Sequence, residues 1–259
     1  WRKDLTLIRD FKICRRVFQD DPSFTQIHVF CDASTKAYGA VIYIRQACQN
    51  NENSASCQML TSKCKVAPVK QLTVPKLELC AALTGVRLLE AVIFALRDIC
   101  SNFEIFAWSD STTVLHWLAN LPGRYQTFVA NRVAQIQEVV PRANWYHIPT
   151  ELNPADLCSR GMSVSDLLTS KMWWQGPDFL QELVLRIPDQ PTDEPTVLSV
   201  SEEKKLPVVS CVVQNLKVVA FETNILNLVD IENFSCITRL LNLLALVLRF
   251  VNILRKKRP

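Results

Sequence analysis

Apolar positions along the first part of the chain are grouped in short runs of residues that favour β-strands. Residues 27–32 and 38–44 are two β-rich apolar runs separated by a short polar connector, a pattern typical of a β-hairpin. Residues 57–62 supply a third strand. A long helical pattern then begins at Pro75, because proline suits the first turn of a helix, and it extends to about residue 97. The pattern therefore predicts three strands followed by a long helix.

Shorter elements follow this helix. The pattern predicts a strand over 103–108, helices over 111–118 and 125–140, and a strand over 144–148. Asn153-Pro154 then begins a turn or short helix that carries Asp156. This order of elements is typical of an α/β domain in which helices pack on a mixed sheet.

The composition of the sequence changes after residue 170. Residues 188–207 are rich in proline and acidic residues, which indicates a linker. A terminal helix is predicted from about residue 234 to residue 254. Its strongly apolar part, residues 240–254, falls short of the ~20 apolar residues needed to span a bilayer. Polar residues recur along it at helical spacing, so we predict an amphipathic helix that packs on a neighbouring domain.

Composition narrows the class of protein only slightly. A hydrophobic fraction of 49%, a charged fraction of 21% and a net charge of +4 describe an ordinary globular protein that is compatible with a nucleic-acid partner. The ten cysteines include no C-x-x-C pair and the three histidines are far apart, which disfavours structural zinc. The chain begins without methionine and ends in basic residues, so we expect both ends to be cuts through a longer polyprotein.

Two acidic residues follow predicted strands, and a third lies on the predicted long helix. Asp32 and Asp110 end the runs that begin at residues 27 and 103, although turn or cap chemistry explains either of them alone. Glu78 shares a helix face with small residues, which suits close packing on a sheet. The alternative for Glu78 is a glutamate that complements the helix dipole.

The four carboxylates of Asp32, Glu78, Asp110 and Asp156 indicate a common site if the two strands are neighbours. Clustered carboxylates repel one another unless cations hold them, and oxygen ligands select Mg²⁺ or Mn²⁺. Two such ions activate a water and stabilise the leaving 3′ oxygen in phosphodiester hydrolysis. The sequence thus predicts a two-metal nuclease site.

Four ordered motifs resemble a known family, the ribonuclease H region of BEL/Pao-type LTR retrotransposon Pol polyproteins. The motifs are Phe30-Cys31-Asp32-Ala33-Ser34, Pro75-Lys76-Leu77-Glu78-Leu79, Trp108-Ser109-Asp110-Ser111 and Asn153-Pro154-Ala155-Asp156-Leu157-Cys158-Ser159-Arg160-Gly161. The resemblance spans roughly residues 24–170. It implies a ribonuclease H-like fold with a five-stranded mixed sheet and flanking helices, followed by a linker and a C-terminal helical segment. It also implies catalytic and metal-binding roles for Asp32, Glu78, Asp110 and Asp156.

The resemblance further implies endonucleolytic cutting of the RNA strand of RNA–DNA hybrids during reverse transcription. We expect a tail of the reverse transcriptase connection region over 1–22, the ribonuclease H-like domain over 23–170, a linker towards integrase over 171–232 and the amphipathic helix over 233–259. The partners implied are the hybrid and the adjoining reverse transcriptase and integrase regions, with no membrane, in a cytoplasmic retroelement particle or in the nucleus.

One departure from cellular ribonucleases H concerns histidine. Those enzymes usually carry a catalytic histidine in a loop before the last acid, whereas His147 is predicted to lie inside a strand. Candidate contacts to the hybrid are Ser34, Thr35, Lys36, Arg124 and Arg132, although ordinary solvated polarity explains each of them alone.

Three alternatives to this enzyme are open. The first is a degenerate ribonuclease H-like module that binds nucleic acid or serves as a structural segment of a polyprotein. The second is an integrase or another nuclease of the same broad fold, which the motif over 153–161 does not suit. The third is a membrane-tethered host protein built from a captured element, which depends on the C-terminal helix alone.

Overall fold

Five strands form a single mixed sheet in the computed structural model of the chain, which describes residues 4–9, 11–13, 16–18, 22–48, 55–100, 102–191 and 197–204. The strands are β1 (Pro22–Ala33), β2 (Ala37–Cys48), β3 (Ser56–Val66), β4 (Glu104–Ser109) and β5 (Trp145–His147). Their order across the sheet is β3-β2-β1-β4-β5. The first three strands pair antiparallel, whereas β4 pairs parallel with both β1 and β5.

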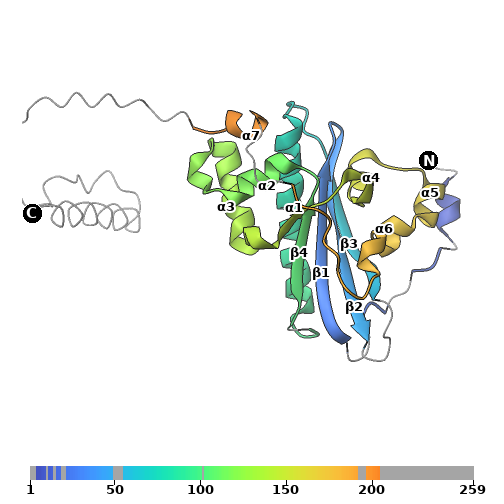
Figure 1. Cartoon of the computed structure of the whole chain (residues 1–259). Coiled ribbons are helices and arrows are strands. Elements are labelled where there is room, and N and C mark those ends of the chain that lie inside the picture. Colours follow the sequence, from blue (N-terminus) through green and yellow to red (C-terminus); the bar gives the residue numbers. More distant parts are fainter. Residues whose placement is uncertain are drawn as a thin grey trace, which may run out of the picture. The chain divides into compact units, whose positions relative to one another are not determined.

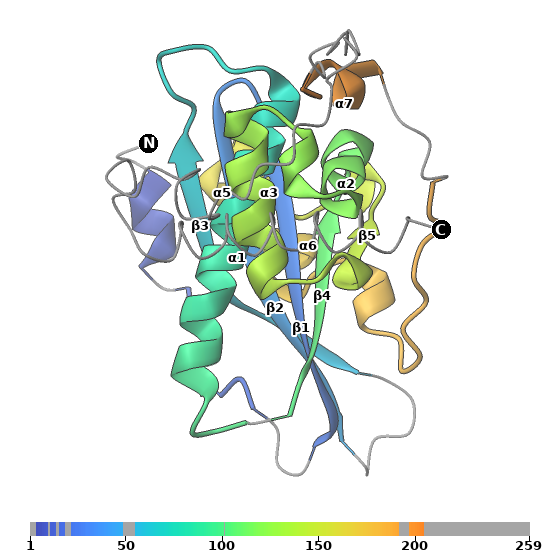
Figure 2. The ribbon, with the colours of Figure 1, turned by 90° about the vertical axis from the view of Figure 1, so that its left-hand side faces the viewer.

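Helices cover both faces of this sheet (Figure 1). The α-helices are α1 (Val74–Leu96), α2 (Thr112–Ala119), α3 (Thr127–Val139), α4 (Asp156–Arg160), α5 (Val164–Thr169), α6 (Lys171–Gln175) and α7 (Val197–Ser201). Short 3₁₀ turns are η1 (Asp4–Ile8), η2 (Pro122–Arg124), η3 (Arg142–Asn144), η4 (Thr150–Leu152) and η5 (Asp178–Leu180). Figure 2 shows α1, α2 and α3 in front of the strands, and Figure 1 shows α4, α5 and α6 on the opposite side.

Successive strand residues point to opposite faces, and this alternation produces two hydrophobic cores. Along β1, Val29 and Cys31 pack in the core under α1, α2 and α3, while Phe30 lies in the core on the other face. Along β4, Ala107 and Trp108 divide in the same way. The two-sided burial explains why these strands read as continuous apolar runs in the sequence.

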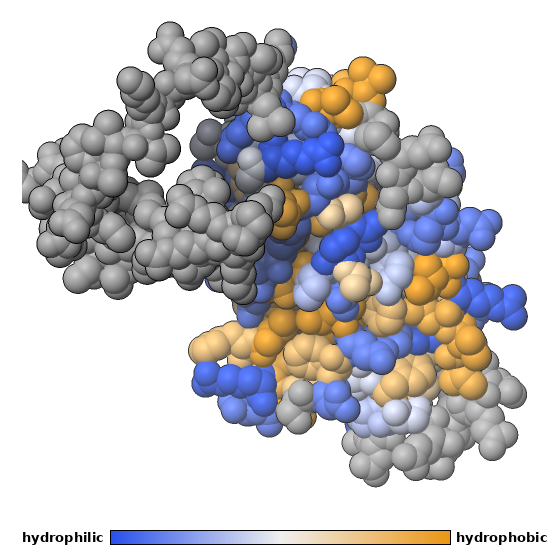
Figure 3. Space-filling view, turned by 60° about the vertical axis from the view of Figure 1, so that its left-hand side comes forward, coloured by the Kyte–Doolittle hydropathy of each residue, from blue (hydrophilic) through white to orange (hydrophobic). Residues whose placement is uncertain are grey.

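Helix α1 lies across the centre of the sheet. Among the described residues it is the one helix long and apolar enough, by length and composition, to cross a membrane. It packs against β1 and β2, and its buried side extends from Leu77 to Leu96, which is the environment of a core helix. Figure 3 shows hydrophobic residues gathered in bands between hydrophilic ones on one face of the molecule.

The predicted fold is confirmed, with small shifts at the element ends. The strand that carries Asp32 continues to Ala33, so this acid lies within β1 rather than after it. Helices α5, α6 and α7 were not predicted as separate elements. The expected helix over 234–254 lies outside the described residues.

The segment after residue 170 packs on the sheet. Trp173 of α6 and Leu180 of η5 are buried in the second core, and the hydroxyl of Tyr43 donates to the Trp173 carbonyl at 2.8 Å. The described part of the predicted linker therefore includes residues that complete the domain, while the division of the chain at residue 170 stays a prediction.

Candidate functional site

The sheet places Asp32 and Asp110 side by side. Strands β1 and β4 are parallel neighbours, and Cys31 pairs with Ser109 at the end of their ladder. Asp32 follows Cys31 and Asp110 follows Ser109, so both acids lie at the same edge of the sheet. A functional site at the carboxyl ends of neighbouring parallel strands is a common arrangement in α/β proteins.

Glu78 reaches the same edge from helix α1. The residues that share its face, Ala81, Ala82 and Gly85, are buried. A Cβ atom added at Gly85 would lie 2.6 Å from Cys31 Sγ, so glycine is needed there for α1 to lie this close to β1. The side chain of Glu78 accepts a hydrogen bond from Ser111, the residue that caps α2 and follows Asp110. The predicted small-residue face is thus confirmed.

Asp156 begins the short helix α4, which packs on β1 and β2. The preceding turn is tied to the sheet by Asn153, whose side chain donates to the Cys31 carbonyl at 3.1 Å and accepts from the Ala155 amide at 3.1 Å. On β2, Gly39 pairs with Asp32, and a Cβ atom added at Gly39 would lie 3.1 Å from Cys158 Cβ. The close approach of α4 to the strands therefore depends on Gly39.

Electrostatic interactions connect the four carboxylates: Asp32 and Asp110 act on Glu78, and Asp156 acts on Asp32 and Asp110. Burial raises the pKa of Asp32 to about 6, and the charges of Asp110 and Asp156 add to this rise. Burial raises the pKa of Glu78 to about 7, with further contributions from Asp110 and Asp32. The pKa of Asp110 is also raised, first by burial and then by Asp156. Ionisation of these acids is therefore costly without a nearby cation.

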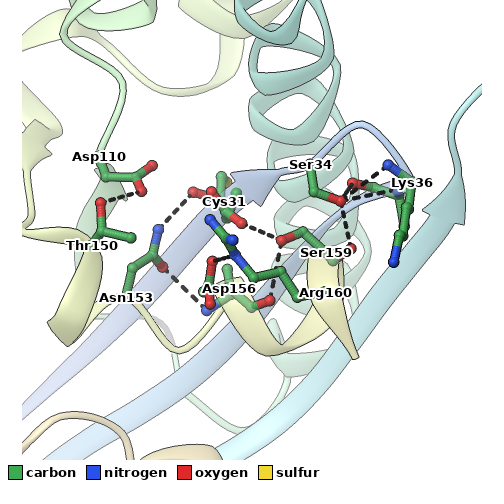
Figure 4. Close-up of polar contacts among 12 residues, drawn as sticks. Cys31, Ser34, Lys36, Asp110, Thr150, Asn153, Asp156, Ser159 and Arg160 are labelled. Atoms are coloured by element: carbon green, nitrogen blue, oxygen red, sulfur yellow. Dashed lines mark hydrogen bonds and ion pairs between the residues drawn. The ribbon is translucent and has the colours of Figure 1, made fainter. Parts of the chain in front are cut away.

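Neighbouring side chains hold two of these carboxylates in place (Figure 4). Ser159 Oγ donates to Asp32 Oδ2, which lowers the pKa of Asp32 against the effect of burial. Thr150 Oγ1 donates to Asp110 Oδ2 at 3.0 Å. Figure 4 shows Ser159, Thr150 and Asp110 near the end of β1 with Asn153 and Asp156.

Arg160 supplies positive charge to this cluster. Its Nε atom lies 2.5 Å from Asp156 Oδ1, and the hydrogen bond to Asp156 raises the pKa of the guanidinium, as do the charges of Asp32 and Asp110. The arginine side chain is exposed, at 65% of its surface. It thus lies on the solvent side of the sheet edge where Asp32, Glu78, Asp110 and Asp156 converge, which we call the acidic edge.

The donor set fits a divalent cation, although the side chains as they stand do not enclose one. Among the described residues, no group of three or more His, Cys, Asp or Glu side chains is arranged to hold a metal ion. Within the same residues, Asp110 Oδ1 is buried and has no hydrogen-bond partner. The two observations are compatible because Asp32, Asp110 and Asp156 each engage a local donor, and rotation of a side chain moves its oxygens while the backbone stays fixed.

The sequence predicted the four acids but not the residues that hold them. Ser159 and Asn153 lie in the motif that carries Asp156, yet no role was predicted for either. Thr150 lies outside all four motifs. His147 lies in β5 as predicted, half-buried, and its charge lowers the pKa of Asp110 slightly against burial. Of the candidate hybrid contacts, Lys36 is exposed, and Ser34 Oγ is bonded at 2.7 Å to the Ser159 carbonyl.

The sheet order, the helices on both faces and the acidic edge at β1 and β4 define a ribonuclease H-like fold. A family model described as the Pao retrotransposon-like RNaseH-like domain matches residues 1–111. Residues 1–111 are therefore similar to the RNase H-like domain of Pao retrotransposons. The matched region includes Asp32, Glu78 and Asp110, and it ends before Asp156.

Comparison with solved structures found ribonucleases H of low sequence identity. One is the N-terminal RNase H domain of a Mycobacterium tuberculosis protein, solved as a fusion with maltose-binding protein, with 14% identity over 53% of this chain and 98% of that chain at a TM-score of 0.33. Another is RNase H1 of Halobacterium salinarum, with 14% identity over 56% of this chain and 99% of that chain at a TM-score of 0.32. A third is LC11-RNase H1 in complex with an RNA/DNA hybrid, with 16% identity over 55% of this chain and 99% of that chain at a TM-score of 0.34. A comparison with curated protein sequences found no match.

Proposed function

We propose that this domain cuts the RNA strand of RNA–DNA hybrids by metal-dependent hydrolysis. The observation that supports the proposal is the convergence of Asp32, Glu78, Asp110 and Asp156 at one sheet edge, where burial and mutual repulsion raise the pKa of three of them. A fold keeps such a cluster at a cost unless a cation compensates the charge. Bound Mg²⁺ or Mn²⁺, as two ions, would supply an activated water and stabilise the leaving 3′ oxygen.

The chain's own residues prepare this edge for a cation and a phosphodiester. Ser159 and Thr150 hold Asp32 and Asp110 in place, and Asp110 Oδ1 is left without a hydrogen-bond partner. Arg160 is bonded to Asp156 through Oδ1, and its exposed guanidinium is suited to a phosphate oxygen of the substrate. The roles of the four acids in the reaction are part of the proposal.

The biological setting is proposed on the same basis. We propose that the domain acts beside the reverse transcriptase and integrase regions of a retrotransposon polyprotein, and that it removes genomic RNA from the hybrid in a cytoplasmic particle. Phosphate contacts would give affinity without sequence preference, as a non-specific nuclease requires.

The test is cleavage of a labelled RNA–DNA hybrid by the full chain with Mg²⁺, with Mn²⁺ and with EDTA. We expect cutting of the RNA strand with either metal, none with EDTA, and a loss of at least about a hundredfold in the Asp32→Asn/Asp110→Asn variant. The matched control is Asp98→Asn/Asp178→Asn, which removes two exposed acids distant in sequence from the site and should cut normally.

Binding of the metal is measured independently by calorimetric titration of the wild type and both variants with Mg²⁺. Heat of binding in the wild type and in the control, but not in Asp32→Asn/Asp110→Asn, supports the metal site. A folded wild-type protein that binds the hybrid but neither binds Mg²⁺ nor cuts RNA would overturn the enzyme proposal in favour of a degenerate nucleic-acid-binding module.

A further inference from the structure

A short segment that follows the domain returns to it and packs beside α2. This acidic segment, residues 197–204, comprises α7 and the three residues after it. Trp117 Nε1 of α2 donates to the Ser199 carbonyl at 3.1 Å, and the Lys204 amide donates to the Arg124 carbonyl at 2.9 Å. Glu203 pairs with Tyr125 as an isolated antiparallel bridge. The segment is therefore held by specific backbone contacts.

Two glutamates of the acidic segment neutralise two cations of the domain. Glu202 Oε1 lies 2.7 Å from Lys76 Nζ, and Glu203 Oε1 lies 2.8 Å from Arg124 Nη2. The Lys76 and Glu202 side chains are only 21% and 15% exposed, so this pair is largely shielded from solvent. Shielding strengthens an ion pair relative to one at an open surface.

The cations that the segment covers belong to a larger basic and aromatic surface. Lys76 lies over the ring of Phe128, 5.7 Å from its centroid, and the guanidinium of Arg132 lies over the same ring at 3.5 Å. Cations interleaved with an aromatic ring are suited to a nucleic-acid backbone, because they supply phosphate contacts with little sequence preference. We define this basic surface as Lys76, Arg124, Arg132 and Phe128.

The basic surface begins next to the acidic edge. Lys76 lies two residues before Glu78 in the first turn of α1, and the helix α2 that contacts the acidic segment is capped by Ser111, the donor to Glu78. Figures 1 and 2 both show α7 at the end of the domain where α1 begins. Lys76 and Glu78 point to different sides of α1, so a nucleic-acid strand held by the basic surface would lie at the same end of the domain as the four carboxylates.

We propose that the acidic segment imitates a nucleic-acid backbone, occupies the basic surface with Glu202 and Glu203, and is displaced when the RNA–DNA hybrid binds. The identity of the nucleic acid rests on the function proposed above, whereas the competition itself does not. A segment of the same chain competes as an intramolecular ligand at high effective concentration. The apparent affinity for the hybrid is then the intrinsic affinity multiplied by the fraction of molecules whose basic surface is open.

The first test measures hybrid affinity by fluorescence anisotropy in EDTA, where no cutting interferes. In the full chain, Glu202→Gln/Glu203→Gln should bind the hybrid about three- to tenfold more tightly, because the charges that hold the segment on the basic surface are lost. The matched control is Glu90→Gln/Glu138→Gln, which removes the same charge from positions on α1 and α3. A gain equal to that of the control, or no gain, overturns the proposal.

A double-mutant cycle tests whether the uncovered cations hold the hybrid. Adding Lys76→Gln/Arg124→Gln to the Glu202→Gln/Glu203→Gln variant should abolish the gain in affinity. The slope of log affinity against log salt concentration should also become shallower, by the amount expected for the loss of about two phosphate contacts. Unchanged affinity and an unchanged salt slope would overturn the proposal, because Lys76 and Arg124 would then only hold the segment in place.

Hydrogen exchange on the wild-type chain tests displacement without any substitution. The Glu203 and Lys204 amides are bonded to the carbonyls of Val200 and Arg124. Their exchange should become faster on addition of the hybrid if the segment leaves, and continued protection at saturating hybrid overturns the proposal. A protein that passes these binding tests but cuts no RNA with Mg²⁺ would refute the enzyme and leave the competition standing, and active cutting without displacement would do the reverse.

Discussion

At the residue scale, a single hydrogen bond opposes the effect of burial on the ionisation of Asp32. Ser159 lies 127 residues after Asp32 in the chain, yet its hydroxyl donates to the Asp32 carboxylate. This hydrogen bond favours the ionised form of Asp32 against burial, and the ionised form is the one that a metal ion requires. Ser159 is therefore a positioning residue rather than a catalytic one.

Ser159→Ala should raise the pKa of Asp32 further above its usual range, by roughly one pH unit, because a hydrogen bond to a charged group is lost. The measurement is an NMR titration of the Asp32 side-chain carboxyl carbon. Ser163→Ala is the control, since Ser163 caps α5 and its hydroxyl is bonded to Asp166. An unchanged Asp32 titration would show that Ser159 does not stabilise the ionised carboxylate.

The raised pKa values of Asp32 and Glu78 also predict how stability depends on pH in the metal-free protein. Between the ordinary values of 3.8 and 4.5 and the folded values of about 6 and about 7, the folded protein binds more protons than the unfolded chain. The stabilising contribution is therefore complete below the ordinary values and is lost as pH rises through about 7. A pKa that differs by one between the folded and unfolded protein corresponds to about 1.4 kcal/mol, so the loss is measurable.

Urea unfolding of the wild type and of Asp32→Asn/Glu78→Gln from about pH 5 to about pH 8 in EDTA checks this sign. The wild type should lose stability relative to the variant as pH rises across this range, because the variant cannot ionise at the two positions. A stability difference that stays constant with pH would show that the two carboxyls titrate normally.

At the element scale, the approach of α1 to the sheet decides where Glu78 lies. The helix rests against β1 at Gly85, where a Cβ atom would lie 2.6 Å from Cys31 Sγ and 3.0 Å from Val29 Cγ1. Both neighbours are buried, so neither can move freely. The glycine in the middle of a helix, which weakens the helix itself, is explained by this close contact.

Gly85→Ala should destabilise the protein by about 1–3 kcal/mol, although alanine favours an isolated helix by about 1 kcal/mol over glycine. The overlap with Cys31 and Val29 outweighs the gain in helix propensity. The free energy of unfolding in urea measures the effect. Gly123→Ala is the control because no atom lies within 4 Å of its added Cβ, and a cost at position 85 no greater than at 123 would contradict the packing argument.

At the scale of the whole domain, the second face of the sheet is closed by residues that follow the four motifs. Arg45 of β2 is 1% exposed and connects this segment to the sheet. Its guanidinium donates to the carbonyls of Leu180, Glu182 and Leu183 and to Gln26 Oε1. One buried cation thus satisfies several carbonyls that would otherwise lack partners.

Arg45→Met should cost about 3 kcal/mol or more, because it leaves these buried acceptors unsatisfied. Arg45→Lys should recover little of the loss, since a single ammonium cannot replace the planar fork of donors. The exposed Arg186 is the control: its ion pair with Glu182 spans 3.5 Å at the surface, and Arg186→Met should change the free energy of unfolding by under about 1 kcal/mol. Equal costs at the two positions would contradict the role given to Arg45.

The amino-acid sequence by itself determined the order and type of the main elements and singled out the four acids. Short apolar runs and one long helical pattern are local signals, and they correctly predicted β1, β2, β3, α1 and β4, although several strands extend beyond the predicted ends. The motifs around Asp32, Glu78, Asp110 and Asp156 were readable for the same reason, because each lies within a few consecutive residues.

Only the tertiary structure decided which residues meet. The parallel pairing of β1 with β4 places Asp32 beside Asp110, and no local signal specifies that strand order. The bond from Ser159 to Asp32 and the ion pairs of Glu202 and Glu203 with Lys76 and Arg124 join residues that are far apart in the chain. Such partners are set by the packing of the whole sheet and its helices, since hydrogen bonds and ion pairs depend on distance in space and not on distance along the chain.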